Sequence, residues 1–476
     1  MHRMLNPQSN GGRSPAWVER LDALLLVVLV VARIRIDTLA EAAVLPMRQQ
    51  DVARHPFLGA LLSEQAMTLL AQQQLVDPVG LLLIVIALGL TLTYLLVHEF
   101  IRHERARFRV SLILIWAIIL STVFASSLKL VLLRQGSGPA SYSHDGGVIQ
   151  TEVAVDMFLS GRNPYAEDYL DTPMAEWGIN EFRTALYHYP YLPWTFIFSA
   201  PFKAVSEAMA GWYDQRFVYL VLFAVTLLLL PGLAGLLKTK LLLVMLLGLN
   251  PIMGSDLIFG QNDSFVLAWV VIGLWSWVRG TRPGAGRGWQ FASGIAIGLA
   301  MASKPTAWFL IPFLGLWVAG APGESGWRAW LRSLWGAAWP AVLAAGLVVI
   351  PYLLWDANAM IDDVWRWSSG TSPTAYQIWG WGASNLVLAS GGVADRFSYW
   401  PFWLPELLIG LPVLIALLWR QGTENTLSRA LWGYGIFLLA FFFVSRFLNE
   451  NYLGYITAFL ALGALVDPSG SQSRSN

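Results

Sequence analysis

Long apolar runs constrain the fold of this chain more than any other feature. Residues 79–97 carry no charged side chain, and residues 110–133 carry only Lys129. A run of about 18 apolar residues is enough to cross the hydrocarbon core of a bilayer as a helix. Of all residues 56% are hydrophobic and only 13% are charged, which leaves little material for a large soluble domain. The sequence therefore predicts an all-α polytopic membrane protein.

Further apolar segments follow along the chain. One of them is split at Lys304 and Pro305, because proline lacks the amide donor that a helix interior requires. We expect about 11 to 13 membrane segments in total, since about 20 apolar residues make one span. Clear segments lie at residues 79–98, 110–133, 217–236, 241–253, 264–278, 337–355, 402–419, 429–445 and 452–466, and less clear ones at 192–209, 291–303 and 306–319.

The two ends of the chain differ in character. Residues 24–32 are apolar and follow Arg13 and Arg20, as in a signal peptide, but with Arg33 after them they fit a retained membrane or interfacial helix equally. We expect a retained helix. Residues 1–466 are predicted to form one membrane-embedded domain with large outer loops at 134–190 and 356–401. The low-complexity tail 467–476 is predicted to be disordered.

Basic residues crowd several short connections between the apolar segments. The positive-inside rule places these connections in the cytoplasm. Counting crossings from them puts every unusual polar cluster on the non-cytoplasmic face of the cytoplasmic membrane, provided that residues 191–205 are re-entrant or interfacial. The basic residues are Arg102, Arg105, Arg107 and Arg109, then Arg279, Arg282 and Arg287, then Arg328 and Arg332, then Arg420 and Arg429.

Charge and cysteine content exclude several classes of function. The net charge of +1 gives no asymmetry that would favour nucleic acid as a partner. The chain has no cysteine, which excludes disulfides and thiolate ligands. His144 and His188 lack the carboxylate spacing that would define a metal geometry. We therefore expect neither a metal nor another cofactor.

A series of short motifs follows the second clear span. In this order the motifs resemble the GT-C superfamily of membrane glycosyltransferases, and above all its bacterial mannosyltransferase-like group that uses polyprenyl phosphate mannose. The resemblance covers about residues 110–320. The motifs are Asp145 in the first outer loop, Gly161-Arg162-Asn163-Pro164-Tyr165, Tyr187-His188-Tyr189-Pro190-Tyr191-Leu192-Pro193, Gly260-Gln261-Asn262 and Lys304-Pro305-Thr306.

The resemblance implies a GT-C fold, a catalytic carboxylate in the first outer loop and a polyprenyl phosphate sugar as donor. The sugar is expected to be a hexose, with mannose as the leading choice, and the acceptor a lipid or a glycan at the outer face. One base suffices for a single inverting displacement, because the phosphate already leaves as an anion.

Asp145 is the first candidate for the base that takes the proton of the acceptor hydroxyl. The adjacent Gly146 and Gly147 let the backbone approach a ligand closely. Asp145 is also a good N-cap for a helix over residues 148–159. Glu152 and Asp156, one helical turn apart on the same face, are the alternative catalytic carboxylates.

Lys304 and Arg446 are the candidate ligands of the donor phosphate. A lysine between two half-length apolar helices is costly in lipid unless it snorkels or binds an anion, and both options stay open. A cation such as Arg446 would stabilise the charge that develops as the phosphate leaves. The alternative for Arg446 is an interface anchor paired with Glu450.

Candidate substrate-binding residues have hydroxyl, amide, imidazole or carboxyl groups that fit sugar hydroxyls. Structural readings stand beside them: a helix stop at 161–165, an aromatic entry to the membrane at 187–191 and a plain turn at 260–263. The candidates are Tyr165, His188, Tyr189, Gln261, Asn262, Asp263, Asn449 and Glu450.

The loop 356–401 is rich in tryptophan. Its indole rings suit either the acceptor side of a sugar site or a membrane interface.

Two other functions remain open. A lipid-linked oligosaccharide polymerase or ligase would carry more basic residues in this loop. A transporter or flippase would show internal repeats, and only the break at Lys304 suits that class.

Overall fold

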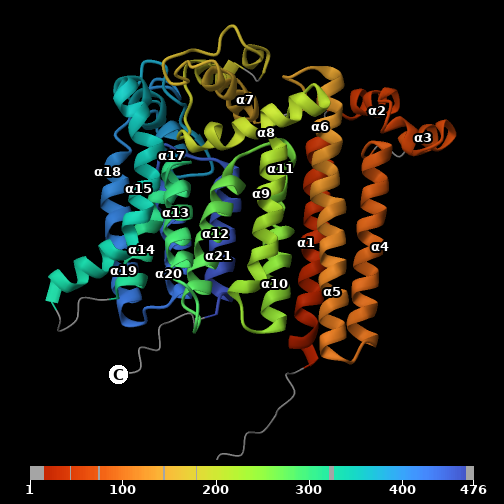
Figure 1. Cartoon of the computed structure of the whole chain (residues 1–476). Helices are drawn as coiled ribbons and strands as arrows, with labels where there is room; N and C mark the ends of the chain where they lie inside the picture. The colour runs from red at the N-terminus through yellow and green to blue at the C-terminus, as the bar shows by residue number, and fades with distance from the viewer. Residues whose placement is uncertain are drawn as a thin grey trace, which may run out of the picture.

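The computed structural model describes residues 16–42, 44–72, 75–142, 145–177, 180–320 and 326–467. These residues form a bundle of long helices that is covered at one end by loops and short helices (Figure 1). We call the covered end, which contains α7 (Gly146–Leu159) and α8 (Trp194–Ala210), the loop face. Within the described residues the sheet is a single parallel pair of two-residue strands, β1 (Trp379–Gly380) and β2 (Phe447–Leu448). The predicted all-α fold is confirmed.

Among the described residues, six helical stretches are long and apolar enough to cross a membrane. The count is up to seven if the bent pair α10 (Leu237–Gly248) and α11 (Pro251–Phe259) is one span. The protein is therefore multi-pass. The six stretches are α4 (Pro78–Phe100), α5 to α6 (Glu104–Ser137), α9 with its 3₁₀ extension (Arg216–Leu233), α15 to α16 (Gly326–Ser369), α18 to α19 (Trp403–Thr423) and α20 (Leu427–Val444).

The remaining predicted segments lie in helices that are charged, short or interrupted, so length and composition alone do not select them. Figure 1 shows these helices running alongside the six longer stretches. They are α1 (Ala16–Ala42), α12 (Asp263–Gly280), α13 (Gly288–Met301), η6 (Pro305–Leu310) with α14 (Ile311–Ala319), and α21 (Glu450–Leu465).

The N-terminal part forms one flank of the bundle. Residues 24–32 lie inside α1, which runs the height of the bundle beside α4, as a membrane helix does and an interfacial helix does not (Figure 1). The short helices α2 (Leu45–Arg54) and α3 (Glu64–Ala71) follow at the loop face. Residues 468–476, predicted to be a disordered tail, lie outside the described residues.

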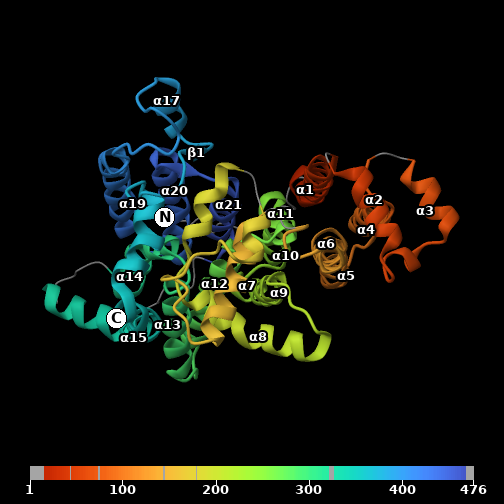
Figure 2. The same cartoon turned by 90° about the horizontal axis from the view of Figure 1, so that it is seen from above.

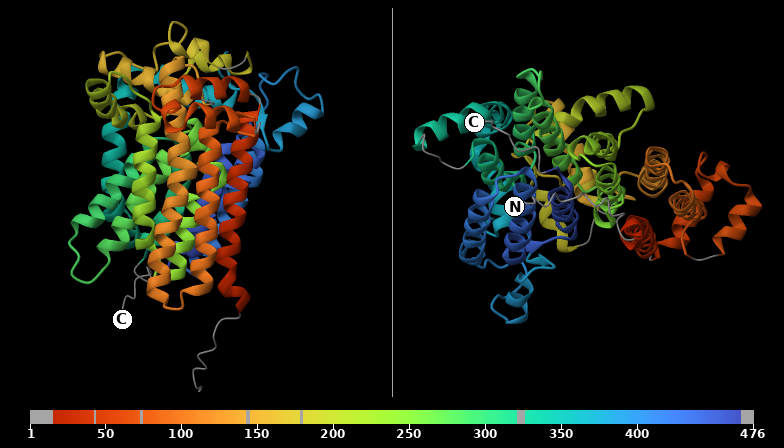
Figure 3. Two further views of the ribbon diagram at one scale, coloured as in Figure 1. Left: turned by 90° about the vertical axis from the view of Figure 1, so that its right-hand side faces the viewer. Right: turned by 90° about the horizontal axis from the view of Figure 1, so that it is seen from below.

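The helix α8 lies across the loop face instead of passing through the bundle, as the views from the side and from above agree (Figures 1 and 2). This confirms the expectation that residues 191–205 do not cross. Lys238 and Lys240, at the start of α10, therefore lie at the end opposite the loop face. The basic connections, such as the one between α4 and α5, lie at that same end (Figure 3).

Small residues let α13 pack closely against neighbouring helices. A Cβ at Gly294 would lie 2.8 Å from the Cβ of Pro340 on α15, and a Cβ at Gly298 would overlap the carbonyl oxygen of Ala341. Helices in membranes associate through such close backbone approach. The α13–α15 contact therefore depends on glycine at these positions.

We predict that Gly298→Ala destabilises the folded protein by about 1–3 kcal/mol, the usual cost of overpacking a filled interior. Thermal unfolding of the purified protein in detergent measures it. Gly89→Ala in α4 is the matched control, because a Cβ there meets no atom within 4 Å. An equal melting temperature for the two variants would contradict the predicted contact.

Candidate active site

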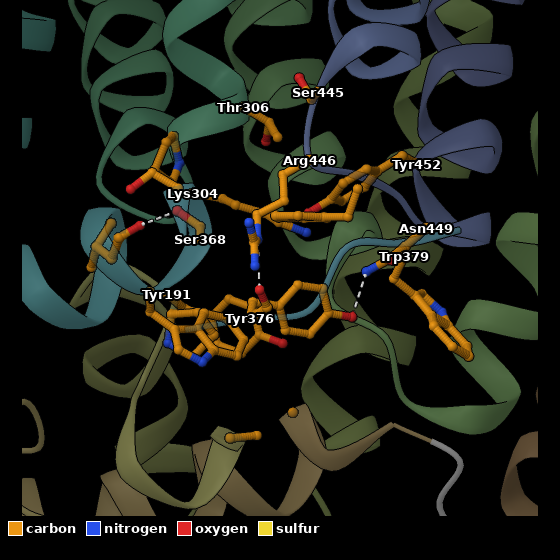
Figure 4. A pocket seen from close by; sticks show the side chains of 18 of the residues that line it. Tyr191, Lys304, Thr306, Ser368, Tyr376, Trp379, Ser445, Arg446, Asn449 and Tyr452 are labelled. Carbon is orange, nitrogen blue, oxygen red and sulfur yellow. Dashed lines mark hydrogen bonds between the residues drawn. The ribbon is translucent and has the colours of Figure 1, made fainter. Parts of the chain in front are cut away.

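A cavity of about 1100 Å³ lies beneath the loop face. Its wall is built by the start of α7, the segment around Tyr191, the helix break at Lys304, residues 364–379 after α15 and residues 399–452 (Figure 4). Segments far apart in the sequence therefore meet in one site. The polar or charged lining residues include Asp145, Gln150, Gln261, Asn262, Lys304, Glu406, Arg446, Asn449, Glu450 and Asn451.

Asp145 caps α7 as predicted, and it also lies in the cavity wall. Its side chain accepts a hydrogen bond from the Gly147 amide at 2.6 Å. Burial raises the pKa of the Asp145 carboxyl above its ordinary value, although the Gly147 amide and the Lys304 charge act against this rise.

The two glycines after Asp145 are needed for tight packing within the protein. A Cβ at Gly147 would lie 2.5 Å from Tyr191 Oη, and one at Gly146 would lie 2.6 Å from Met174 Cε. The start of α7 is thereby pressed against the neighbouring wall segments.

Lys304 is paired inside the protein. Its Nζ donates to Asp263 Oδ1 at 2.7 Å and to Asn262 Oδ1 at 3.3 Å, and it lies 4.9 Å from the centre of the Tyr452 ring. Asp263 also accepts a hydrogen bond from Asn451. Lys304 and Asn262 line the cavity, whereas Asp263 is fully buried behind them. The structure therefore places a partly neutralised ammonium in the cavity wall and gives Asp263 a supporting position.

Arg446 is held by backbone carbonyls. Its guanidinium donates to the oxygens of Tyr376 at 2.6 Å, Ser398 at 3.0 Å and Phe397 at 3.1 Å (Figure 4). In the described part of the chain no carboxylate lies within ion-pair distance of it, so the pair with Glu450 that was the alternative for Arg446 does not form. Burial lowers the pKa of Arg446 to about 10, so the side chain remains a cation at neutral pH.

Among the other predicted residues, Gln261, Asn449 and Glu450 also line the cavity. Asn449 Nδ2 donates to the Tyr376 hydroxyl at 3.3 Å, and Glu450 is exposed at the start of α21.

Glu152 and Asp156 do not reach the cavity. Glu152 receives two hydrogen bonds from Arg134, at 2.8 and 2.6 Å, and one from the Gln215 amide at 2.8 Å. Asp156 forms an ion pair with Lys203 at 2.5 Å. The helical periodicity of α7 turns both away from Asp145. Their partners, Arg134 and Lys203, give these two carboxylates a structural role.

Tyr165, His188 and Tyr189 lie behind the wall. The Tyr165 hydroxyl donates to the Tyr191 carbonyl at 2.8 Å, and the Tyr189 hydroxyl bonds to Thr195 at 2.9 Å. These buried side chains support the segment that carries Tyr191 and do not line the cavity.

His188 joins the loop 134–190 to the segment that follows α15. Its Nδ1 lies 2.8 Å from Asp363 Oδ1, and its Nε2 lies 2.6 Å from Thr374 Oγ1. The side chains of His188, Asp362 and Asp363 lie near enough to one another to hold a metal ion. Sequence reasoning could not find this trio, because its two carboxylates lie in the distant loop 356–401. His144 lies outside the described residues.

Sequence reasoning also missed several lining residues. Three tyrosines present an aromatic ring to the cavity: Tyr191, Tyr376 and Tyr452 (Figure 4). Of these, only Tyr191 belongs to one of the sequence motifs. Of the missed lining residues, Glu406 could have been found from the sequence. It lies within an apolar span, where a carboxylate is rare unless it has a function.

We predict that Lys304→Met destabilises the protein by about 3–5 kcal/mol, because Asp263 would be left as a buried charge without its cation. The double variant Lys304→Met with Asp263→Asn should recover part of this loss. Denaturant or thermal unfolding of the single and double variants gives the coupling energy. Additive effects of the two substitutions would show that the pair contributes nothing.

Comparison with family models bears on the middle third of the chain. The family model for alpha-(1->6)-mannopyranosyltransferase, N-terminal domain, matches residues 155–320, which include Lys304 but neither Asp145 nor Arg446. No curated protein matches the chain.

A solved structure, ArnT from Cupriavidus metallidurans bound to undecaprenyl phosphate, is similar with 18% identity and a TM-score of 0.40. The match covers 68% of this chain and 55% of that one, so the chain spans about half of ArnT. A likeness this weak carries no argument about the site. The family match, by contrast, bears out the mannosyltransferase resemblance and the enzyme class that the motifs predicted, since residues 155–320 are similar to the N-terminal domain of alpha-(1->6)-mannopyranosyltransferases.

Proposed function

We propose that this protein transfers a hexose, with mannose as the first choice, from a polyprenyl phosphate to a lipid or glycan acceptor. The observation that carries the proposal is the shared wall of one cavity, where the Asp145 carboxylate lies with the cations Lys304 and Arg446. A base and anion-binding groups are the functional groups that such a transfer needs.

In the proposed reaction, Asp145 takes the proton of an acceptor hydroxyl while the hydroxyl oxygen attacks the anomeric carbon. The bond from that carbon to the phosphate oxygen breaks on the opposite side, so the configuration inverts. The phosphate leaves as an anion and needs no proton. Lys304 and Arg446 stabilise the negative charge that develops on it, and Asp263 keeps Lys304 in place.

The two sides of the cavity suit the two substrates. Aromatic side chains line the side next to α20 and α18, where an isoprenoid chain would find apolar contacts; they include Phe402, Trp403, Phe441 and Phe442. On the other side Trp177, Trp365 and Trp367 offer indole faces on which an acceptor sugar would stack.

The distribution of basic residues supports an outer-face reaction in the cytoplasmic membrane. The basic connections lie at the end of the bundle opposite the cavity (Figures 1 and 3). With that end in the cytoplasm, as the positive-inside rule favours, the cavity faces outward.

We predict that Asp145→Asn lowers kcat by about 10²–10⁴-fold, the usual contribution of a general base, while donor binding is kept. Transfer from a panel of radiolabelled polyprenyl phosphate sugars to candidate lipid acceptors measures it. Asp156→Asn is the matched control and should keep normal activity, because Asp156 pairs with Lys203 away from the cavity. Full activity of Asp145→Asn would exclude this residue as the base.

The pH dependence offers a second check. Asp145 acts as a base only when ionised, and burial raises its pKa. Activity should therefore fall as the pH is lowered, with a midpoint above about 4, the value of an exposed aspartate. The pH profile of kcat at saturating donor measures this midpoint. A midpoint at or below about 4 would mean that another group limits the reaction in acid.

A further inference from the structure

Residues 379–400 leave the bundle as a hairpin that projects sideways next to the cavity (Figure 2). The hairpin carries the short helix α17 (Ser384–Ala389). Figure 3 shows α17 on the lower edge of the hairpin, level with the ends of the long helices on the loop-face side. We call residues 379–400 the side hairpin.

The base of the side hairpin is fixed to the residues around Arg446. The Trp379 amide donates to the Arg446 carbonyl at 3.3 Å, and the Trp381 amide donates to the Leu448 carbonyl at 2.9 Å. The Arg446 guanidinium binds the Ser398 carbonyl of the returning limb. The side hairpin is therefore attached to the body through both of its limbs.

The outer surface of the side hairpin is apolar. Trp381 is 68% exposed and Leu386 is 71% exposed. No charged side chain occurs from residue 379 to residue 394. Asp395 is bound by the Phe397 and Ser398 amides. Arg396 lies 5.3 Å from the centre of the Trp379 ring, so both charged residues of the side hairpin belong to its returning limb. A surface with large exposed apolar groups and no charge from residue 379 to residue 394 is unusual in contact with water.

This apolar surface continues onto a membrane-spanning element. The stretch Trp403–Thr423 is long and apolar enough to cross a membrane, and it begins directly after the side hairpin. Its first turns expose Leu407 by 50% and Leu408 by 70%, and neither side chain lines the cavity. Exposed side chains on a membrane span face lipid, so the side hairpin extends a surface that lipid already covers.

We propose that the side hairpin lies in the interfacial region of the bilayer, with Trp381 and α17 in contact with lipid on the loop-face side. Tryptophan prefers this depth, and a short uncharged helix can rest there with its apolar side chains among the lipid chains. The partner is thus the lipid surface itself. Because the side hairpin is fixed to Arg446, this contact sets the height of that part of the cavity wall relative to the membrane.

The chain has no cysteine, so single cysteines can be labelled without a background. The probe is an environment-sensitive nitrobenzoxadiazole dye at Leu386→Cys, in nanodiscs that contain lipids with a doxyl quencher near the headgroup. Leu408→Cys on the span is the lipid-facing control, and Ser160→Cys at the exposed end of α7 is the aqueous control.

We expect quenching at Leu386→Cys to reach at least half of that at Leu408→Cys and to exceed clearly that at Ser160→Cys. Quenching no greater than at Ser160→Cys would overturn the proposal. A third outcome is a blue-shifted emission that is not quenched and that is lost when each nanodisc holds a single chain. This outcome would assign the surface to contact with a second copy of the chain, and it would also overturn the proposal. Ala389→Cys, also exposed on α17, replaces Leu386→Cys if the latter does not fold.

Discussion

The ion pair between Lys304 and Asp263 is the interaction on which the site depends. It joins the start of α12 to the break between α13 and η6, and through Asn451 it reaches α21. The Leu192 and Trp194 amides donate to the carbonyls of Ser303 and Ala302 and so attach the segment that enters α8 to the same point. A buried charge without a partner costs several kcal/mol, so these elements must meet for the bundle to be stable. The same requirement leaves an ammonium in the wall of the cavity.

The cavity combines two kinds of surface because of how its walls arise. The charged and amide groups come from helix starts and breaks, where the backbone leaves regular structure. The aromatic groups come partly from the spans, as with Phe441 on α20, and partly from the loops, as with Trp177 and Tyr376. In the proposed reaction, the sugar and the isoprenoid would meet between these surfaces, in the cavity that Asp145 and Arg446 both line.

Local features of the structure were predictable from the sequence, and distant pairings were not. The spans follow from apolar length, the cap of α7 from Asp145, and the position of α8 from the need to keep Lys238 with the other basic residues. The role of Glu152 depends on its pairing with Arg134, and the role of His188 depends on Asp363, which lies 175 residues further along the chain. Arg446 binds carbonyl oxygens, which every residue carries, so no sequence pattern could have marked its partners.

The hydrogen bonds from Arg446 to distant backbone carbonyls have a consequence for how the protein is made. Arg446 follows its partner Tyr376 by 70 residues. During synthesis the side hairpin and the strand β1 must therefore wait until α20 has entered the membrane before they find their final contacts. A nascent chain that ends before Arg446 would already contain most of the bundle and the carboxylate of Asp145. Its cavity would still lack the part of the wall that Arg446 and the residues after it form. The capacity to act on a substrate is thus acquired late, after most of the protein is already inserted.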